Sequence, residues 1–202
     1  MLFLAFLHDP LGMLGFLLGL VVAITVHEAS HAWVAYKLGD STAKLAGRIT
    51  LNPLAHLDPM GTLFLFLVGF GWGIPVPINP YNFKNPKWDQ LFVSLAGPGA
   101  NLILAILLSA LYRLLPTPLL LAIIAVNLIL MIFNLLPIPP LDGSKVLRIF
   151  MSEEAFFNLQ RMGLPILLLI LLFNLFFPII PIIINYTVSF LLFWLTGASF
   201  TF

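Results

Sequence analysis

The stretch that decides the fold is Leu11–Leu38, which reads LGMLGFLLGLVVAITVHEASHAWVAYKL. A helix that crosses the hydrocarbon core of a bilayer needs roughly 20 consecutive, mostly apolar residues, and this stretch is longer than that. Glu28 and Lys37 are its only carboxylate or ammonium side chains. The stretch therefore predicts a membrane-spanning helix whose second half holds ionisable groups, and such groups inside a span are costly and functional by default.

Composition places the whole chain in the same class. Of its 202 residues, 61% are hydrophobic and 8% are charged, whereas an average soluble domain is about 45–50% apolar and about 25% charged. A compact soluble domain of this size cannot hide so much apolar surface, and a disordered chain needs the opposite composition. The sequence therefore predicts an all-α polytopic membrane protein, with residues 1–202 forming one integral-membrane domain in contact with the lipid bilayer.

Charge and cysteine content exclude further classes. The net charge is +1 and the chain has no Cys. The Lys and Arg residues form no basic stripe that could follow a phosphate backbone, so we expect no nucleic-acid partner. Without Cys, the chain forms neither a disulfide framework nor a thiolate metal site.

Other segments also have the length and apolar character of spans. Leu91–Leu115 and Leu119–Leu136 are each sufficient to cross, and the tail Leu164–Phe202 is apolar but interrupted by Pro178 and Pro181. Together with the first stretch, these segments predict about five to six transmembrane helices.

The segment Met60–Ile78 is apolar but broken by Gly and Pro. If it crosses, the nine Lys and Arg residues divide four against five between the two sides; if it enters and returns, they divide eight against one, with Arg113 alone on the minor side. A strong bias of Lys and Arg residues towards one side of the membrane is typical of membrane proteins. We therefore expect a re-entrant or extended membrane segment near residues 60–80, in a multi-pass cell-membrane protein with its long polar loops in the cytoplasm.

The chemistry-bearing motif is His27-Glu28-Ala29-Ser30-His31. Histidines at positions i and i+4 lie on one face of a helix, about one turn apart, as two zinc ligands require. Glu28 is rotated by about 100° from His27, which lets it take a proton from water without ligating the metal. The spacing therefore predicts a zinc site inside the first span.

Two histidines leave a catalytic zinc site incomplete, because it needs a third protein ligand and an open position. We favour Asp142, which follows the prolines that end a predicted span; the alternative is that Asp142 caps a helix beginning near Ser144. His27 lies about 24 Å beyond Leu11 at about 1.5 Å per residue, and Asp142 follows a span that runs in the same direction. We therefore expect His27 and Asp142 at one depth, with the active site towards the cytoplasmic side.

The remaining acidic and histidine candidates lie in polar segments. Asp40, Asp89, Glu153 and Glu154 are expected to be solvated. His56 and Asp58 lie two residues apart in an interfacial context, where polar residues at headgroup level are common. Their role stays open from the sequence.

Three motifs, in order and inside apolar segments, resemble the site-2 protease family of intramembrane zinc metalloproteases. They are HEASH at 27–31, SLAGPGAN at 94–101 and NLLPIPPLDG at 134–143. The stretches 48–59 and 75–80 resemble its compact prokaryotic branch, which has no PDZ or CBS domain. The resemblance covers about residues 11–150, the expected catalytic core.

The resemblance implies one Zn²⁺ per chain, held by His27, His31 and Asp142, with Glu28 as the general base. It also implies cleavage within a substrate's transmembrane segment, so the expected partner is a single-span membrane protein. Asn134 is expected near the active site, where it holds a substrate carbonyl or orients Glu28, or else forms an interhelical contact. Asn101 is expected mainly to pack against the helix that bears the histidines, beside the small residues at 97–100.

Two further questions stay open at this level. The run Pro75–Pro80 is either an extended edge, onto which a substrate strand adds, or an ordered loop. The alternative function is a non-proteolytic membrane metal-binding protein, either a transporter or a catalytically silent adaptor. A transporter is expected to show paired broken helices in two similar halves, and the sequence shows no internal repeat.

Overall fold

The computed structural model describes residues 10–68 and 71–198. The ends of the predicted domain 1–202, and residues 69–70 of the predicted re-entrant segment, lie outside these ranges. The elements are, in chain order, α2 (Pro10–Lys37), α3 (Thr42–Leu45), η1 (Pro53–Ala55), α4 (Pro59–Val68), η2 (Pro80–Asn82), α5 (Pro86–Leu114), α6 (Pro118–Leu135), η3 (Asp142–Ile149), α7 (Glu153–Arg161), α8 (Gly163–Phe176) and α9 (Ile179–Thr196).

The architecture is the all-α polytopic membrane fold that the sequence predicts. Four of the described helices, α2, α5, α6 and α9, are long and apolar enough to cross a bilayer. A fifth crossing results if α7 and α8, which meet at a bend of 57°, form one broken span. Within the described ranges the only β-pairing is an isolated bridge between Leu57 and Gly73.

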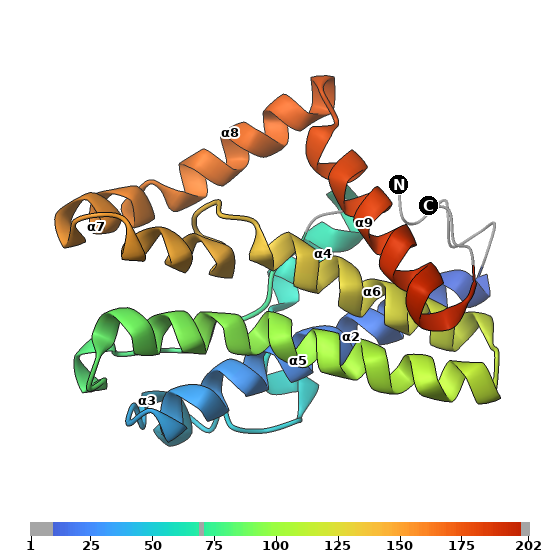
Figure 1. The fold of residues 1–202 in the computed structure, drawn as a ribbon, viewed down its shortest axis with the longest axis horizontal. Helices are drawn as coiled ribbons and strands as arrows, with labels where there is room; N and C mark the ends of the chain where they lie inside the picture. The colour runs from blue at the N-terminus through green and yellow to red at the C-terminus, as the bar shows by residue number, and fades with distance from the viewer. Residues whose placement is uncertain (1–9, 69–70, 199–202) are drawn as a thin grey trace.

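Helices α2, α5 and α6 form the centre of the molecule, with α9 against α5 and α6 (Figure 1). Small residues let the first helix approach closely: a Cβ built on Gly15 of α2 would lie 2.8 Å from Ala122 Cβ on α6. On the other side of α6, Ile124 and Leu128 are fully buried in a cluster that includes Leu192 of α9. Close packing of α2 against α6, and of α6 against α9, therefore fixes the position of the first span.

Helix α5 begins at Pro86, five residues before the predicted span. Proline at the first helical position needs no hydrogen-bond partner. The carboxylate of Asp89 accepts from the backbone N–H of Asn85 (2.9 Å), which satisfies a donor at the helix start. These two residues extend the helix into a segment whose polarity alone indicates a loop.

In the tail, the prolines end one helix and begin another. Helix α8 ends at Phe176, just before Pro178, and α9 starts at Ile179. Pro181 lies in the first turn of α9, where proline is tolerated. The predicted interruption is therefore a single sharp turn between two helices.

The segment after α3 folds back on itself. Helix α4 has 10 residues, about 15 Å at about 1.5 Å per residue, which is too short to cross. Leu57, before α4, pairs with Gly73, after it, and Ile74 N–H donates to the carbonyl of His56 (2.7 Å). Both ends of the excursion therefore lie side by side, as the re-entrant prediction requires.

Buried Arg48 fastens the returning segment. Its guanidinium donates to the carbonyl oxygens of Ile74 and Pro75 and contacts His56 Nδ1 at 3.4 Å. His56 is fully buried, with Nε2 2.9 Å from the carbonyl oxygen of Thr50. Asp58 caps α4 by accepting from the N–H of Gly61 (2.7 Å). His56 and Asp58 thus serve the loop and helix structure around the re-entrant segment.

Candidate metal centre and catalytic site

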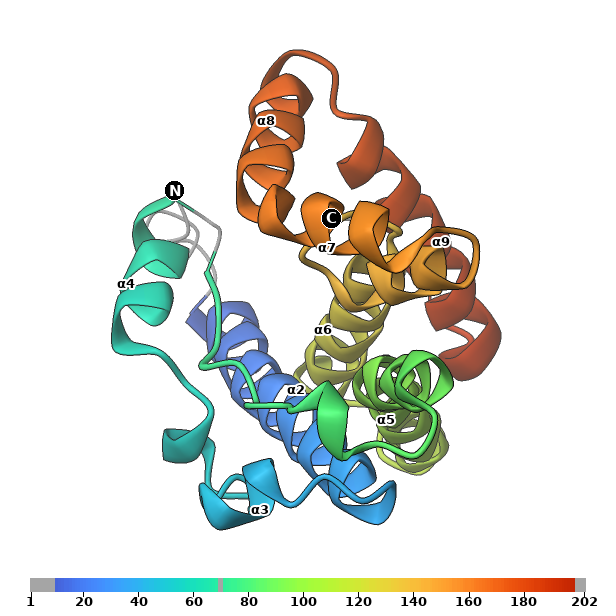
Figure 2. The same cartoon turned by 90° about the vertical axis from the view of Figure 1, so that its left-hand side faces the viewer.

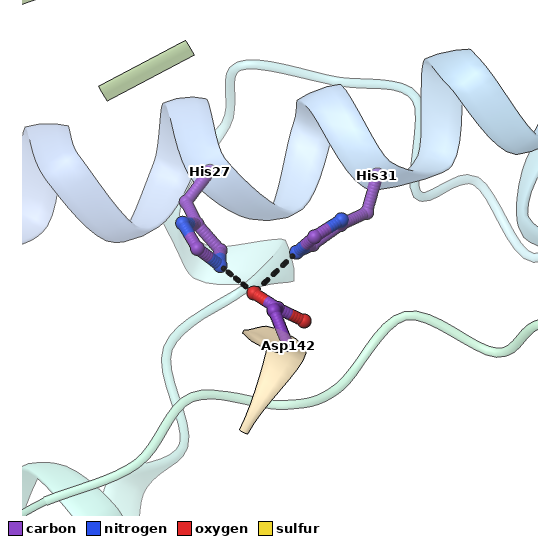
Figure 3. Close-up of side chains that lie close together, drawn as sticks. All are labelled: His27, His31 and Asp142. Atoms are coloured by element: carbon purple, nitrogen blue, oxygen red, sulfur yellow. Dashed lines mark hydrogen bonds and ion pairs between the residues drawn. The ribbon is translucent and has the colours of Figure 1, made fainter. Parts of the chain in front are cut away.

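His27, His31 and Asp142 converge on one point, although 115 residues separate the first from the last. Helix α2 supplies both histidines and the first residue of η3 supplies the aspartate (Figure 3). Asp142 Oδ2 lies 3.0 Å from His27 Nε2 and 3.2 Å from His31 Nε2. The three ligand atoms lie within 4.8 Å of one another, so one small cation could be held by all three.

Hydrogen bonds on the far side of each ring fix the tautomers. His31 Nδ1 lies 2.6 Å from the carbonyl oxygen of Val93, which can only accept. His27 Nδ1 lies 2.7 Å from Asn101 Oδ1. Each Nδ1 therefore carries the proton and each Nε2 presents a lone pair towards the Asp142 carboxylate. Two imidazole lone pairs and a carboxylate oxygen repel one another unless a positive charge lies between them. This set of ligand atoms therefore fits a zinc ion.

Gly97 of α5 lies against the Nε2 atoms of both histidines. A Cβ at this position would lie 2.5 Å from His31 Nε2 and 2.6 Å from His27 Nε2. No real side chain tolerates such contacts, so glycine is what lets α5 cover this side of the candidate centre. The predicted packing of the small residues at 97–100 against α2 is present at Gly97, and Asn101, predicted mainly to pack, hydrogen-bonds His27 directly.

Asp142 is placed by the break after α6. Pro137 cannot continue the helix, and η3 begins at Asp142 itself, with Leu141 at the N-cap position and no side-chain cap. The capping role that the sequence left open is therefore wrong. Arg148 ties η3 to the start of α5 by donating to the Pro86 carbonyl (3.1 Å), which holds Asp142 beside the histidines.

Glu28 and Asn134 line one cavity beside the histidine pair. The cavity has a volume of about 510 Å³, and its walls are mainly apolar side chains from α2, α6 and α8, with Gly61 and Thr62 of α4 and residues 71–73. Glu28 Oε2 accepts from the N–H of Val76 (3.2 Å). Asn134 donates to the carbonyl of Leu130 in its own helix (3.0 Å), and no interhelical hydrogen bond of Asn134 occurs among the described residues.

Two residues of this region were missed by sequence reasoning. Asn127 of α6 hydrogen-bonds Asn101, and Arg48 holds the returning segment. Asn127 carried a signal, because it is one of two amides, with Asn134, in an apolar span. The importance of Arg48 depends on which segment lies opposite, and no local pattern specifies that.

Comparison with known proteins identifies the family. The model of peptidase family M50 matches residues 15–122 and 113–176. The chain is 45% identical over 157 residues to "Putative zinc metalloprotease YwhC" of Bacillus subtilis, covering 70% of this chain and 72% of the relative. It is 33% identical over 194 residues to "Putative zinc metalloprotease Rip2" of Mycobacterium tuberculosis, covering 90% and 73%.

A more distant relative is "Zinc metalloprotease MJ0392" of Methanocaldococcus jannaschii, 29% identical over 140 residues, which are 67% of this chain and 34% of the relative. No solved structure matches the chain. All three relatives carry the name of a zinc metalloprotease, qualified as "Putative" in two cases, and none is named as a transporter or adaptor. The chain belongs to peptidase family M50 and is a membrane-bound, site-2 protease-like zinc metalloprotease.

Proposed function

We propose that this protein is an intramembrane zinc endopeptidase that hydrolyses peptide bonds in or near the transmembrane segments of membrane proteins. The observation that carries the proposal is the position of the histidine pair. His27 and His31 lie within α2, a helix apolar enough to span the bilayer, and a largely apolar cavity reaches His27 and Glu28. An apolar peptide segment is the protein substrate that such walls accommodate.

In this proposal His27, His31 and Asp142 hold one zinc ion per chain. When bound, zinc polarises the scissile carbonyl and makes an attacking water more acidic. Glu28, one residue from His27 and on the cavity side, takes a proton from that water while the water oxygen bonds to the carbonyl carbon. As the carbon–nitrogen bond breaks, Glu28 returns the proton to the departing amine. Asn134, on the same cavity wall, is suited to donate a hydrogen bond to the substrate carbonyl.

The substrate must be extended at the cleaved bond, because a helix shields its own peptide groups. The segment 74–77 has no donor to spare for strand addition. The Ile74 and Val76 N–H groups already donate to His56 and Glu28, and Pro75 and Pro77 have none. We therefore place the substrate along the cavity walls between α4 and α8, which stand apart in Figure 2.

The active site faces the cytoplasm in this proposal. Lys87 Nζ donates to the carbonyl of Ile149 (3.0 Å), and α3, the start of α5 and α7 lie at one end of the molecule (Figure 1). Of the nine Lys and Arg residues, Arg113 alone lies at the far end of α5. Positively charged loops favour the cytoplasmic side.

Cleavage in reconstituted membranes tests the proposal. A panel of single-span proteins is incorporated with the protease into liposomes, and the cleavage sites are mapped by mass spectrometry. We expect cuts inside or next to the apolar segment by the wild type and none by Glu28→Gln. Cuts confined to exposed loops far from the bilayer would contradict intramembrane cleavage, and equal cutting by Glu28→Gln would contradict the assigned base.

A further inference from the structure

Two fully buried amides meet in the centre of the bundle. Asn101 of α5 and Asn127 of α6 are both 0% exposed, and Asn101 Nδ2 donates to Asn127 Oδ1 at 3.0 Å. A polar side chain inside a membrane span is expensive unless its hydrogen-bonding groups are satisfied. We therefore expect the pair to have a role beyond packing, and the direction of its hydrogen bonds indicates that role.

Three of the four N–H groups of the two amides have a defined acceptor. Asn101 Nδ2 donates to the carbonyl of Ala23 (3.0 Å) as well as to Asn127, which uses both of its hydrogens. Asn127 Nδ2 donates to the carbonyl of Ile123, one turn back in α6 (2.9 Å), which fixes Asn127 Oδ1 towards Asn101. The Oδ1 atom of Asn101 is left facing His27 Nδ1 at 2.7 Å.

This direction decides which nitrogen of His27 faces the metal site. Asn101 Oδ1 only accepts, so His27 must carry its proton on Nδ1 and present an Nε2 lone pair. A flipped Asn101 amide would set its oxygen against Ala23 O and Asn127 Oδ1, two further acceptors. Partners behind a ligating histidine orient the ring and set its tautomer.

We propose that Asn127 is a positioning residue of the zinc site, acting through Asn101 on the tautomer and orientation of His27. The inference rests on the proposed role of His27 as a zinc ligand. Through this relay, a side chain of α6 that touches neither metal nor substrate sets the metal affinity of a residue on α2. The three central helices are thereby joined by one hydrogen-bonded chain that ends at the metal.

Zinc affinity of the full chain in detergent, measured by chelator competition, tests the relay. Asn127→Leu is expected to weaken zinc binding about 10-fold, and Asn101→Leu about 10- to 100-fold, the usual range for partners behind a ligand. The double variant is expected to bind no more weakly than Asn101→Leu alone, because the effect of Asn127 passes through Asn101. The visible spectrum of bound Co²⁺ is expected to change in the same variants.

Two substitutions serve as controls. Asn127→Asp, whose buried carboxyl group is protonated and keeps one donor and one acceptor, is expected to bind zinc nearly as wild type. Ser109→Ala removes a buried hydroxyl of α5 that, among the described residues, bonds only the Ala105 carbonyl of its own helix (2.7 Å), and it is expected to leave affinity unchanged. If Asn127→Leu does not fold, Asn127→Ser replaces it, because its hydroxyl bonds Ile123 as Ser109 bonds Ala105 but falls short of Asn101.

The outcomes are separable from those of the proposed function. If Asn127→Leu and Asn127→Ser bind zinc within twofold of wild type while His27→Ala does not, the relay is wrong and the ligand set stands. Multiplying effects in the double variant would also overturn the relay. If His27→Ala itself retains wild-type affinity, the proposed ligand set fails.

Discussion

Gly97 shows how a single missing side chain shapes the candidate metal site. Helix α5 would place a Cβ 2.5–2.6 Å from the Nε2 atoms of both histidines if Gly97 were any other residue. At this point α2 and α5 therefore approach more closely than an ordinary side chain would permit. The contact between the two helices forms one wall of the candidate zinc centre.

Gly97→Ala is expected to weaken zinc binding by about 10- to 100-fold, because an overpacking cost of about 1–3 kcal/mol falls on the ligand atoms themselves. Gly99→Ala is the matched control, since a Cβ there meets nothing within 4 Å. Chelator competition measures both. Equal zinc affinity in the two variants would show that α5 does not cover the metal-facing side of the histidines.

At the scale of single residues, the sequence predicts the groups whose chemistry shows in a local pattern. The spacing of His27 and His31 places them on one face, and the prolines before Asp142 place it at the end of a span, and the structure brings these three residues together. Asn127 and Arg48 are different, because their importance comes from what lies opposite in three dimensions. Whether His27, His31 and Asp142 hold the metal stays a prediction, as do the roles of Glu28, Asn101 and Asn134.

The returning segment is the element that joins the loop before α4 to the candidate base. The Arg48 guanidinium donates hydrogen bonds to the Ile74 and Pro75 carbonyl oxygens. The next N–H along the chain, that of Val76, donates to Glu28. Displacement of this short run by one ångström would shift the carboxylate that the mechanism relies on. The position of Glu28 is thus set partly by a residue twenty positions along the chain.

Arg48→Met is expected to lower the cleavage rate by roughly 10- to 100-fold, a cost typical of misplaced catalytic groups, while zinc content stays at the wild-type level. Arg161→Met, on an exposed side chain, is the control. Rate and zinc content are measured on the same samples. A variant that loses zinc together with activity would place the effect of Arg48 at the metal ligands rather than at Glu28.

Asp40 fastens the end of α2 to the loop before α5. Burial is the largest influence on this carboxylate and raises its pKa, but hydrogen bonds from Thr42, Asn79 and Asn82 together hold the pKa below its ordinary value of 3.8. The Asn79 N–H and Asn82 amide each donate to it at 2.7 Å. The folded protein therefore binds this proton less readily than the unfolded chain does.

The sign of the pH dependence follows from this lowered pKa. The stability that Asp40 contributes is fully present above 3.8, the ordinary value, and is lost as the pH falls through the lower pKa of the folded state. Asp40→Asn is expected to lower the melting temperature at pH 6 and to show a smaller fall between pH 5 and pH 3. Glu154→Gln, on an exposed carboxylate, is the control, and parallel curves for Asp40→Asn and wild type would contradict the assignment.

At the scale of elements, apolar length predicts the spans well. The predicted Leu119–Leu136 and the observed Pro118–Leu135 differ by one residue at each end, because prolines mark both boundaries. The start of α5 was missed, since Pro86 and Asp89 stabilise a helix end in a stretch that is polar overall. The re-entrant segment was found from charge asymmetry, whereas the Leu57–Gly73 bridge that closes it depends on pairing that no local pattern reveals.

Across the whole molecule, Lys and Arg residues are divided unequally between the two ends. Lys44 lies in α3, Lys87 lies at the start of α5, and Arg148 bonds the Pro86 carbonyl, so these three share that end, whereas Arg113 donates to the Leu195 carbonyl at the end of α9 (2.8 Å). This separation is what the topology proposal requires of a chain whose α4 segment returns.

Single-cysteine labelling tests the topology directly, because the native chain has no Cys. Cysteines replacing Lys44, Lys84 and Arg161 are expected to react with a membrane-impermeant reagent only from the cytoplasmic face. A cysteine replacing Arg113 is expected to react from the outside. Labelling of the Lys44 and Lys84 positions from opposite faces would contradict the re-entrant segment, and uniform reversal would contradict the cytoplasmic active site.

The most direct test of the central claim is to measure zinc content and cleavage of a single-span substrate in the same preparations of wild type, Glu28→Gln and Asp142→Ala. The account predicts that Glu28→Gln keeps one zinc per chain while cleavage falls by about 10²–10⁴-fold, the usual contribution of a general base, and that Asp142→Ala loses both zinc and cleavage. Unchanged cleavage by zinc-loaded Glu28→Gln, or full zinc occupancy in Asp142→Ala, would contradict it.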